Sequence, residues 1–420
     1  MASNSKIRAF YIKLLFTKNE GGIYMSRWLV VLGAVLIQIN LGAVYAWSLF
    51  NQPLMDKFGW DREDIVVTFS ITIAVFAFTT IFAGRLQDKI GPRWVATIGG
   101  LFLGLGLILS SQATSLGQLY FFYGVVGGIG IGMTYVCPLS ACVKWFPDKR
   151  GFISGVAVAG FGLGGLIYKP IIGIFIEQFG VSQAFFYLGI VYMILVVAGA
   201  QLLKNPPETN EANASTSQSE QFSPLQMLKT YQFYVLWTVF LFGSISGLLV
   251  ISFAVDIGVE LVQLDAAKAA NAVMVIALFN AGGRIVLGNL SDKLGRKNTL
   301  MMIYALTAVI MFYMSTGMMN YPMFLIAVSL IGFCFGGYLA LFPSVTADYY
   351  GTKNIGTNYG FMYQAYGISA FAGPFVIKVV SFTQAFLISG VICVVAILLV
   401  KFVQAPKGVP TQQPIEKEAY

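Results

Sequence analysis

Apolar segments long enough to cross a lipid bilayer recur through this 420-residue sequence. A helix needs about 20 predominantly apolar residues to span the hydrocarbon core of a membrane. Strands of a membrane barrel would alternate in character over about ten residues, whereas these segments are apolar on all sides. We place twelve of them, near residues 28–50, 65–84, 95–112, 117–142, 152–177, 184–203, 231–256, 267–288, 299–318, 321–347, 357–380 and 382–403. The sequence therefore predicts an all-α membrane protein with twelve transmembrane helices in the lipid bilayer.

The composition excludes several classes of protein. Hydrophobic residues make up 57% of the chain and charged residues 10%, against about 25% charged residues in an average soluble protein. Such a chain cannot cover a soluble enzyme or a nucleic-acid-binding domain with polar side chains. The sequence also contains no nucleophile–base–acid set, metal-ligand cluster or ATPase motif. We expect no enzyme activity, no cofactor and no nucleic-acid partner, and any active transport must be secondary.

Basic residues predict the orientation in the membrane, because cytoplasmic connections carry an excess of Lys and Arg. Connections that follow even-numbered segments hold Arg85, Lys89, Arg93, Lys144, Lys149, Arg150, Lys204, Lys229, Lys293, Arg296, Lys297 and Lys353. The other connections and their borders hold only Lys57, Arg62, Lys268 and Lys378. We therefore expect a multi-pass protein of the plasma (cytoplasmic, or cell inner) membrane with both termini in the cytoplasm. Charges interrupt the apolar patch in residues 1–27, which favours a retained tail over a signal peptide.

The two halves of the chain match at an offset of 204 or 205 residues. Segment 84–93 recurs as 288–297, and Pro138, Gly151, Gly155 and Pro170 match Pro343, Gly356, Gly360 and Pro374. This repeat predicts two six-helix bundles related by duplication. We expect an N-terminal tail (1–27), a first bundle (28–203), a flexible polar linker (204–230), a second bundle (231–403) and a C-terminal tail (404–420).

The repeated segment has the pattern Gly-x-Leu-x-Asp-Lys-x-Gly in both halves. It resembles the signature of the major facilitator superfamily, and its double occurrence extends the resemblance over essentially the whole chain. The resemblance implies the fold of that superfamily, with twelve helices in two six-helix bundles. Asp88 and Asp292 lie where a carboxylate can cap neighbouring helix ends and pair with local Arg or Lys residues. We expect them to form a conformational latch; the alternative is that they are only topology charges.

Arg284 stands out among the ionisable residues of the predicted transmembrane helices. It lies eight residues before Asp292, about 12 Å from the end of the helix, and half of the hydrocarbon core is about 15 Å thick. A guanidinium cannot lose its proton at this depth, so it needs an anion or a ring of acceptors. The repeat places Thr80 at the equivalent position. We predict that Arg284 binds a substrate anion; a structural ion pair or a snorkelling side chain is the alternative.

Other residues extend the predicted site. Asn280 lies four residues before Arg284, on the same helix face. Lys169 on the fifth helix is predicted to serve in the site or in a gate, and Asp256 is the best-placed carboxylate for a proton in a chain without histidine. For Asp256 an interface anchor or outer-gate ion pair is the alternative. Aromatic residues on helices expected to line a central cavity complete the predicted site: Tyr45, Tyr123, Tyr135, Phe335, Tyr338 and Tyr366.

Five further stretches resemble the oxalate/formate antiporter family, which is related to the monocarboxylate transporters. They cover residues 45–50, 144–151, 279–284, 342–344 and 358–361. The resemblance implies transport of a small carboxylate. In the oxalate carrier an Arg on the eighth helix binds one carboxylate group and a Lys on the eleventh binds the other. The Arg matches Arg284, whereas Tyr366 occupies the position of the Lys.

One cation beside a neutral hydroxyl favours a substrate with a single negative charge, because a second charge would be uncompensated. We expect a monomeric secondary transporter that moves a monocarboxylate such as lactate or pyruvate by H+ symport with alternating access. Lys169 could supply a second positive charge from another helix, which would weaken this preference. Monocarboxylate transporters of the mammalian type carry Asp where this chain has Asn280, so a proton cannot use that position. The alternatives are an oxalate/formate-type exchanger and a carboxylate sensor that transports nothing.

Overall fold

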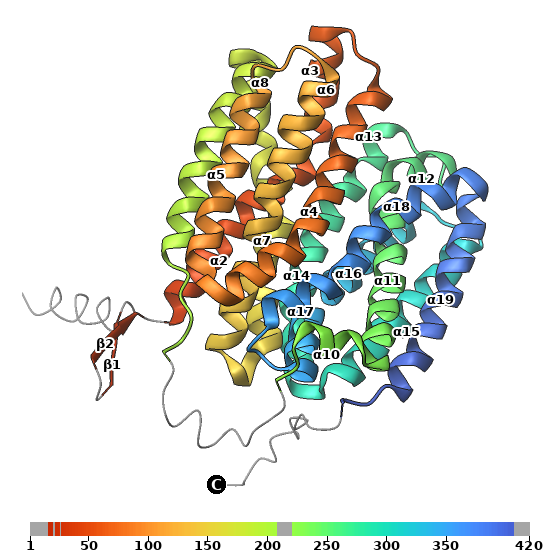
Figure 1. The fold of residues 1–420 in the computed structure, drawn as a ribbon. Helices are drawn as coiled ribbons and strands as arrows, with labels where there is room; N and C mark the ends of the chain where they lie inside the picture. The colour runs from red at the N-terminus through yellow and green to blue at the C-terminus, as the bar shows by residue number, and fades with distance from the viewer. Residues whose placement is uncertain (1–15, 20–21, 26, 208–220, 407–420) are drawn as a thin grey trace, which may run out of the picture.

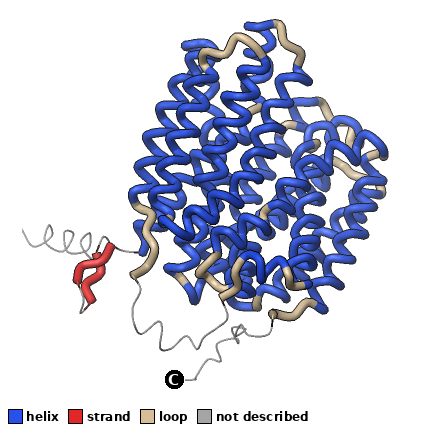
Figure 2. Tube along the Cα trace, viewed as in Figure 1, coloured by secondary structure: helices blue, strands red, loops and turns tan. Residues whose placement is uncertain are grey.

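The computed structural model describes residues 16–19, 22–25, 27–207 and 221–406. Parts of the predicted tails and linker (1–15, 208–220 and 407–420) lie outside these residues. Helices make up nearly all of the described chain (Figures 1 and 2). A short antiparallel hairpin, β1 (Phe16–Asn19) with β2 (Gly22–Met25), precedes the first membrane helix. The hairpin belongs to the predicted tail, so the membrane-spanning part is all-α, as the sequence predicted.

The N-terminal half contains six passages through the molecule. The first is α2 (Arg27–Gly42), a 3₁₀ turn (Ala43–Ala46) and α3 (Ser48–Phe58). The second and third are α4 (Arg62–Ile90) and α5 (Pro92–Ser110). The fourth joins α6 (Leu116–Leu119), a π-helical stretch (Tyr120–Gly127) and α7 (Gly128–Trp145). After a 3₁₀ turn (Pro147–Lys149), α8 (Arg150–Gln201) supplies the fifth and sixth passages.

The C-terminal half follows the same plan. The short α10 (Pro224–Leu228) leads into α11 (Tyr231–Ser252) and α12 (Ala254–Glu260), which form the seventh passage. Then follow α13 (Ala266–Ala269), α14 (Asn271–Leu294), α15 (Arg296–Ser315) and α16 (Tyr321–Tyr350). The eleventh passage is α17 (Ile355–Met362) with α18 (Gln364–Val379), and the twelfth is α19 (Phe382–Phe402). Figure 1 shows the two halves side by side.

Ten helical segments of the described chain are long and apolar enough to cross a membrane. Two breaks account for the difference from the predicted twelve. The first divides the long segment Pro147–Gln201 into two passages, and the second divides the eleventh passage into two helices that are each too short to be counted. Gly180 turns the chain inside α8 with a positive φ of 78°, which glycine adopts without steric cost. At Tyr363 the carbonyl oxygen accepts from both the Tyr366 and Gly367 amides, at 3.0 and 3.2 Å, so the hydrogen-bond ladder tightens between α17 and α18.

The two halves cross where glycines let backbones touch. A Cβ atom added to Gly84 of α4 would lie 2.2 Å from the Gly356 carbonyl oxygen of α17, and one added to Gly288 of α14 would lie 2.3 Å from the Gly151 oxygen of α8. Only a residue without a side chain fits at these two repeat-related crossings. We call the end of the molecule that holds these crossings, α10 and α17 the latch end, and the opposite end, with α3 and α13, the far end (Figure 1).

Candidate functional site

Arg284 of α14 lies buried between the two halves, with 1% of its surface exposed. Its Nε donates to the Asn280 Oδ1 atom at 2.9 Å, and its Nη1 donates to the Val158 carbonyl oxygen of α8 at 2.5 Å. Asn280 in turn donates to the Gly332 carbonyl oxygen of α16 at 3.3 Å. Within the described residues Arg284 makes no ion pair. A permanent cation is therefore held by neutral acceptors, and its remaining donors are available for an anion.

Tyrosines from both halves surround this cation. The charge of Arg284 interacts electrostatically with the hydroxyl groups of Tyr45, Tyr135, Tyr359 and Tyr366. The Tyr45 and Tyr366 hydroxyls are hydrogen-bonded at 2.8 Å, which links the first passage to the eleventh. We call Arg284, Asn280 and these four tyrosines the central cluster.

Tyr359 is a member of the central cluster that the sequence analysis did not select. Its hydroxyl is buried and has no hydrogen bond of ordinary geometry among the described residues, although the Tyr135 hydroxyl lies near enough to interact with it. A buried, unpaired hydroxyl is costly unless a ligand or water supplies the missing partner. The signal was present, because Tyr359 belongs to the stretch 358–361 and lies seven residues, or about two helical turns, before Tyr366.

Glycines of α8 make the space that Arg284 occupies. A Cβ atom added to Gly162 would lie 3.0 Å from the Asn280 Oδ1 atom and 3.4 Å from the Arg284 Nε atom. One added to Gly165 would lie 3.3 Å from the Tyr45 Cβ atom. The glycine-rich sequence of α8 therefore brings the guanidinium against the backbone of the opposite half.

Three predicted aromatic residues lie at or beyond the border of the central cluster. The Phe335 ring lies 6.3 Å from the Tyr366 ring, at the border. Tyr123 packs against Trp47 at 4.4 Å inside the N-terminal half. Tyr338 bonds to the Thr307 hydroxyl at 2.9 Å inside the C-terminal half. Neither Tyr123 nor Tyr338 has a ring contact with a member of the cluster, and their part in binding stays a prediction.

Two charged candidates lie away from Arg284. Lys169 is exposed on α8, and Asp256 is exposed on α12, toward the far end. Neither has an ion-pair partner among the described residues. Neither side chain is joined to the central cluster by a hydrogen bond or an ion pair within the described residues, and the roles of both stay predictions.

Asp88 joins the end of α4 to the start of α17 in the other half. Its carboxylate accepts from the Gly356 amide at 3.1 Å, from the Thr357 amide at 2.8 Å and from the Thr357 hydroxyl at 2.9 Å. The first amides of a helix have no partner inside the helix, and a carboxylate there also meets the positive end of the helix dipole. Asp88 therefore caps α17 across the junction of the bundles.

Asp292 makes the matching junction from the C-terminal half. Its carboxylate accepts from the Gly151 amide at 2.9 Å and from the Phe152 amide at 2.7 Å, at the start of α8. An ion network adds to this cap: Arg296 pairs with Asp292 at 2.6 Å and with Asp348 at 2.8 Å. Arg150, also at the start of α8, pairs with Asp348 at 2.6 Å. Both predicted latch carboxylates thus bind the opposite bundle at the latch end.

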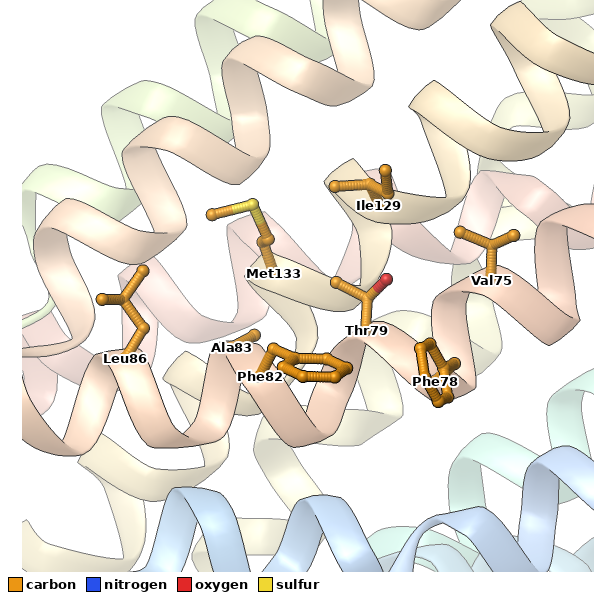
Figure 3. Close-up of a pocket in the computed structure, with 8 residues that line it drawn as sticks. All are labelled: Val75, Phe78, Thr79, Phe82, Ala83, Leu86, Ile129 and Met133. Carbon is orange, nitrogen blue, oxygen red and sulfur yellow. The ribbon is translucent and has the colours of Figure 1, made fainter.

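A separate pocket opens on the side of the N-terminal half, between α4 and α7. Figure 3 shows the side chains that line it, which come from Val75, Phe78, Thr79, Phe82, Ala83, Leu86, Ile129 and Met133. Its lining carries no charge, and none of these residues belongs to the central cluster. The Thr79 hydroxyl is the polar side-chain group of this lining, and the lining has no cation to balance a carboxylate.

Known proteins resemble the chain over most of its length. The model of the Major Facilitator Superfamily matches residues 30–374. The uncharacterized MFS-type transporter YhjX of Escherichia coli (strain K12) is 34% identical over 82% of this chain and 86% of its own. The oxalate:formate antiporter of Oxalobacter formigenes is 31% identical over 95% of this chain and 97% of its own. Monocarboxylate transporter 12 of Rattus norvegicus is 25% identical over 92% of this chain and 87% of its own.

A solved structure supports the fold. The proton:xylose symporter XylE bound to 6-bromo-6-deoxy-D-glucose superposes with a TM-score of 0.72, at 14% sequence identity. The superposition covers 92% of this chain and 97% of that chain. At this identity the likeness shows the arrangement of helices alone.

Proposed function

The chain belongs to the major facilitator superfamily, and we propose that it is a secondary transporter for a small monocarboxylate of the lactate or pyruvate class. The observation that carries the proposal is the state of Arg284, which is buried between the bundles and has no carboxylate partner among the residues that the structure describes. Charged groups in such places are paired, or they bind a charged ligand. The carboxylate carriers among the relatives support an organic acid as that ligand.

The central cluster favours a single negative charge. Arg284 supplies one positive charge, whereas Tyr45, Tyr359 and Tyr366 supply neutral hydroxyls within its electrostatic reach. A carboxylate on the guanidinium would leave these hydroxyls to bond a keto or hydroxy oxygen. A second carboxylate would find no second cation in the cluster, and its desolvation would be costly. We therefore favour a monocarboxylate over oxalate.

The latches support alternating access. The two carboxylates and the ion network join the halves at the latch end, and we propose that this is the cytoplasmic end, closed in this state. Substrate would then enter from the far end, reach Arg284, and leave after both latches open. A carboxylate bound to Arg284 contacts both halves through the tyrosines, so its binding energy can favour rearrangement of the bundles.

We favour coupling to protons over exchange. Symport of a proton with a monoanion moves no net charge, so the membrane potential does not oppose uptake. With Asn280 beside Arg284 the proton would travel on Asp256 or with the substrate. The second candidate is exchange of carboxylates, which the 31% identical oxalate:formate antiporter favours.

Uptake into proteoliposomes separates these proposals. Purified protein would be reconstituted, and initial uptake of radiolabelled pyruvate and lactate measured with and without an inward proton gradient. Symport predicts uptake into empty vesicles that increases with the gradient. Uptake that requires internal carboxylate and ignores the gradient would establish exchange instead. Binding to the solubilised protein without any flux would contradict transport.

A further inference from the structure

We infer that Lys169 is a separate docking residue for the carboxylate at the far end, where it captures the anion from water before the anion reaches Arg284. This inference rests on the proposed function, because it assumes a carboxylate substrate. It assigns Lys169 a place in the order of binding, apart from the central cluster.

The direction of the Lys169 side chain follows from the helix. Successive helical residues turn by about 100°, so positions three, four, seven or eleven apart share a face. Lys169 therefore shares the face of α8 that carries Gly155, Gly162 and Gly165. Their added Cβ atoms would lie 2.1 Å from the Arg284 carbonyl oxygen, 3.0 Å from Asn280 and 3.3 Å from Tyr45, respectively. Lys169 thus points toward the junction between the halves.

The opposite face of α8 is apolar and exposed, as expected of a face that meets lipid. Ile167 and Ile174 are 40% and 49% exposed, and by the same geometry both lie about 140–160° around the helix from Lys169. A Lys directed to that face would place its charge against hydrocarbon, which is costly at this depth. Its position on the inner face avoids that cost if water reaches the junction there.

The packing on this face of α8 changes near Lys169. Each of the glycines before it on this face would contact the opposite half or Tyr45, whereas a Cβ atom added to Gly173, four residues further, would meet nothing within 4 Å. The Lys169 side chain is itself exposed. Among these glycines the contacts with the opposite half thus end at Gly162, and the face is open at Gly173; Lys169 lies between these two positions.

Lys169 and Arg284 are placed for sequential contact with an anion. Gly162 lies beside the guanidinium, and Lys169 follows it by seven residues, which corresponds to about 10 Å along α8. The ammonium group is a compact charge on a flexible stem, so it can bind a carboxylate in the open part and move with it. A charge beside a narrowing passage also raises the local concentration of the opposite ion. Lys169 would therefore act on capture rather than on translocation.

The test is a side-specific kinetic measurement. Initial rates of radiolabelled pyruvate transport would be compared in right-side-out and inside-out membrane vesicles for wild type, Lys169→Gln, Lys169→Arg and Lys57→Gln. Lys57 is an exposed lysine of α3 at the same end, and its ammonium bonds to the Ser182 hydroxyl at 2.7 Å. It serves as the matched control for loss of one positive charge.

We expect Lys169→Gln to raise KM about tenfold at low salt, from the side on which the far end is exposed and with unchanged kcat. Lys169→Arg should restore KM, and Lys57→Gln should leave it within about twofold. The difference should shrink at high salt, because ions screen an exposed charge. Purified variants with wild-type melting temperatures would exclude misfolding.

Two results would overturn the docking role. An unchanged KM in Lys169→Gln, beside a wild type that transports pyruvate, would remove Lys169 from the path and leave the proposed function standing. A loss of kcat from both sides would place Lys169 in the same site as Arg284. Absence of pyruvate, lactate and oxalate flux in the wild type would overturn the proposed function itself.

Discussion

The two halves of the molecule share their crossings but differ at the centre. Gly155 of α8 lies against the Arg284 carbonyl oxygen, and the repeat-related Gly360 of α17 lies against the Thr80 oxygen. The backbones therefore meet in the same way twice. The side chains do not match in charge, because Thr80 offers a neutral hydroxyl that donates to the Ala77 carbonyl oxygen at 2.6 Å and to the Gly360 carbonyl oxygen of α17 at 3.4 Å, whereas Arg284 presents a cation to α8. The repeated part of the structure brings the bundles together, and the unrepeated cation supplies the chemistry.

The latches differ in a second way. Asp292 shares its junction with Arg296, Asp348 and Arg150. Asp88 has no ion pair among the described residues; instead the linker braces the helix that it caps. The Phe222 carbonyl oxygen accepts from the Asn354 and Asn358 side chains, each at 3.1 Å, beside the start of α17. We infer that charge stiffens one latch and hydrogen bonds from the linker stiffen the other.

The largest expected effect separates the two central positions. Arg284→Gln should lower pyruvate uptake at least about 100-fold, because the anion loses hydrogen bonds to a charged group worth about 1.5–3 kcal/mol each. Thr80→Val at the repeat-related position should stay within about threefold, since it removes a neutral hydroxyl. Initial uptake rates in proteoliposomes, with equal amounts of protein, test both. Equal losses of uptake in the two variants would contradict the claim that Arg284, which has no counterpart in the other half, is the residue that binds the substrate.

A second prediction concerns the crossings. Gly155→Ala and Gly360→Ala should each reduce uptake about 30-fold. A methyl group placed against a backbone carbonyl oxygen destabilises the state in which the latch end is closed by about 1–3 kcal/mol. The two losses should be similar, because both crossings form the same contact. The latch end should then open more often, which the labelling rate of a cysteine introduced there would report. A large loss in one variant and none in the other would contradict a shared mechanism.

Substitution of the latch carboxylates should reduce uptake less, and by different amounts for the two residues. Asp292→Asn should slow uptake about tenfold and Asp88→Asn about fivefold, since each weakens charge-assisted caps worth about 1.5–3 kcal/mol. Asp292→Asn also leaves Arg296 with Asp348 as its remaining carboxylate partner. Uptake measured at low and high salt sharpens the comparison, because the ion network is more sensitive to salt than the Asp88 cap. The reverse order of losses would argue against the stiffening role of the network.

The smallest expected loss of total transport accompanies a change of substrate preference. Tyr366→Lys adds a second cation to the central cluster and should raise the oxalate/pyruvate uptake ratio about tenfold while total transport falls only a few-fold. Tyr366→Phe serves as the control, because it removes the hydroxyl without adding a charge. Competition of both acids against labelled pyruvate gives the ratio. An unchanged ratio in Tyr366→Lys would show that charge balance does not decide the substrate.

The sequence predicted the membrane helices well, because apolar length and the internal repeat are local or periodic properties. The predicted depth of Arg284 in the membrane stays a prediction. It did not predict that the guanidinium bonds to the Val158 carbonyl oxygen. Any residue carries a carbonyl oxygen, so no side chain marks such a partner. The break at Tyr363 was also missed, since an interruption of one hydrogen bond leaves no Gly or Pro signal at that residue.

The positions of the remaining candidates show the limit of counting along helices. Tyr123 and Tyr338 lie on helices expected to line the cavity, but helix rotation turns their rings into the interior of one bundle. Tyr359 was passed over, although the same rotation brings it to Arg284. Packing between halves fixes that rotation, and sequence periodicity gives little information where a helix is apolar on all sides.

The central claim is that Arg284 holds one carboxylate in a buried site with no second cation. Equilibrium binding of pyruvate and oxalate to the purified protein, measured by calorimetry in wild type and Arg284→Gln, tests it most directly. The account predicts one pyruvate bound per wild-type chain, weaker binding of oxalate, and loss of both in Arg284→Gln. Binding of pyruvate that survives in Arg284→Gln with unchanged affinity would contradict it.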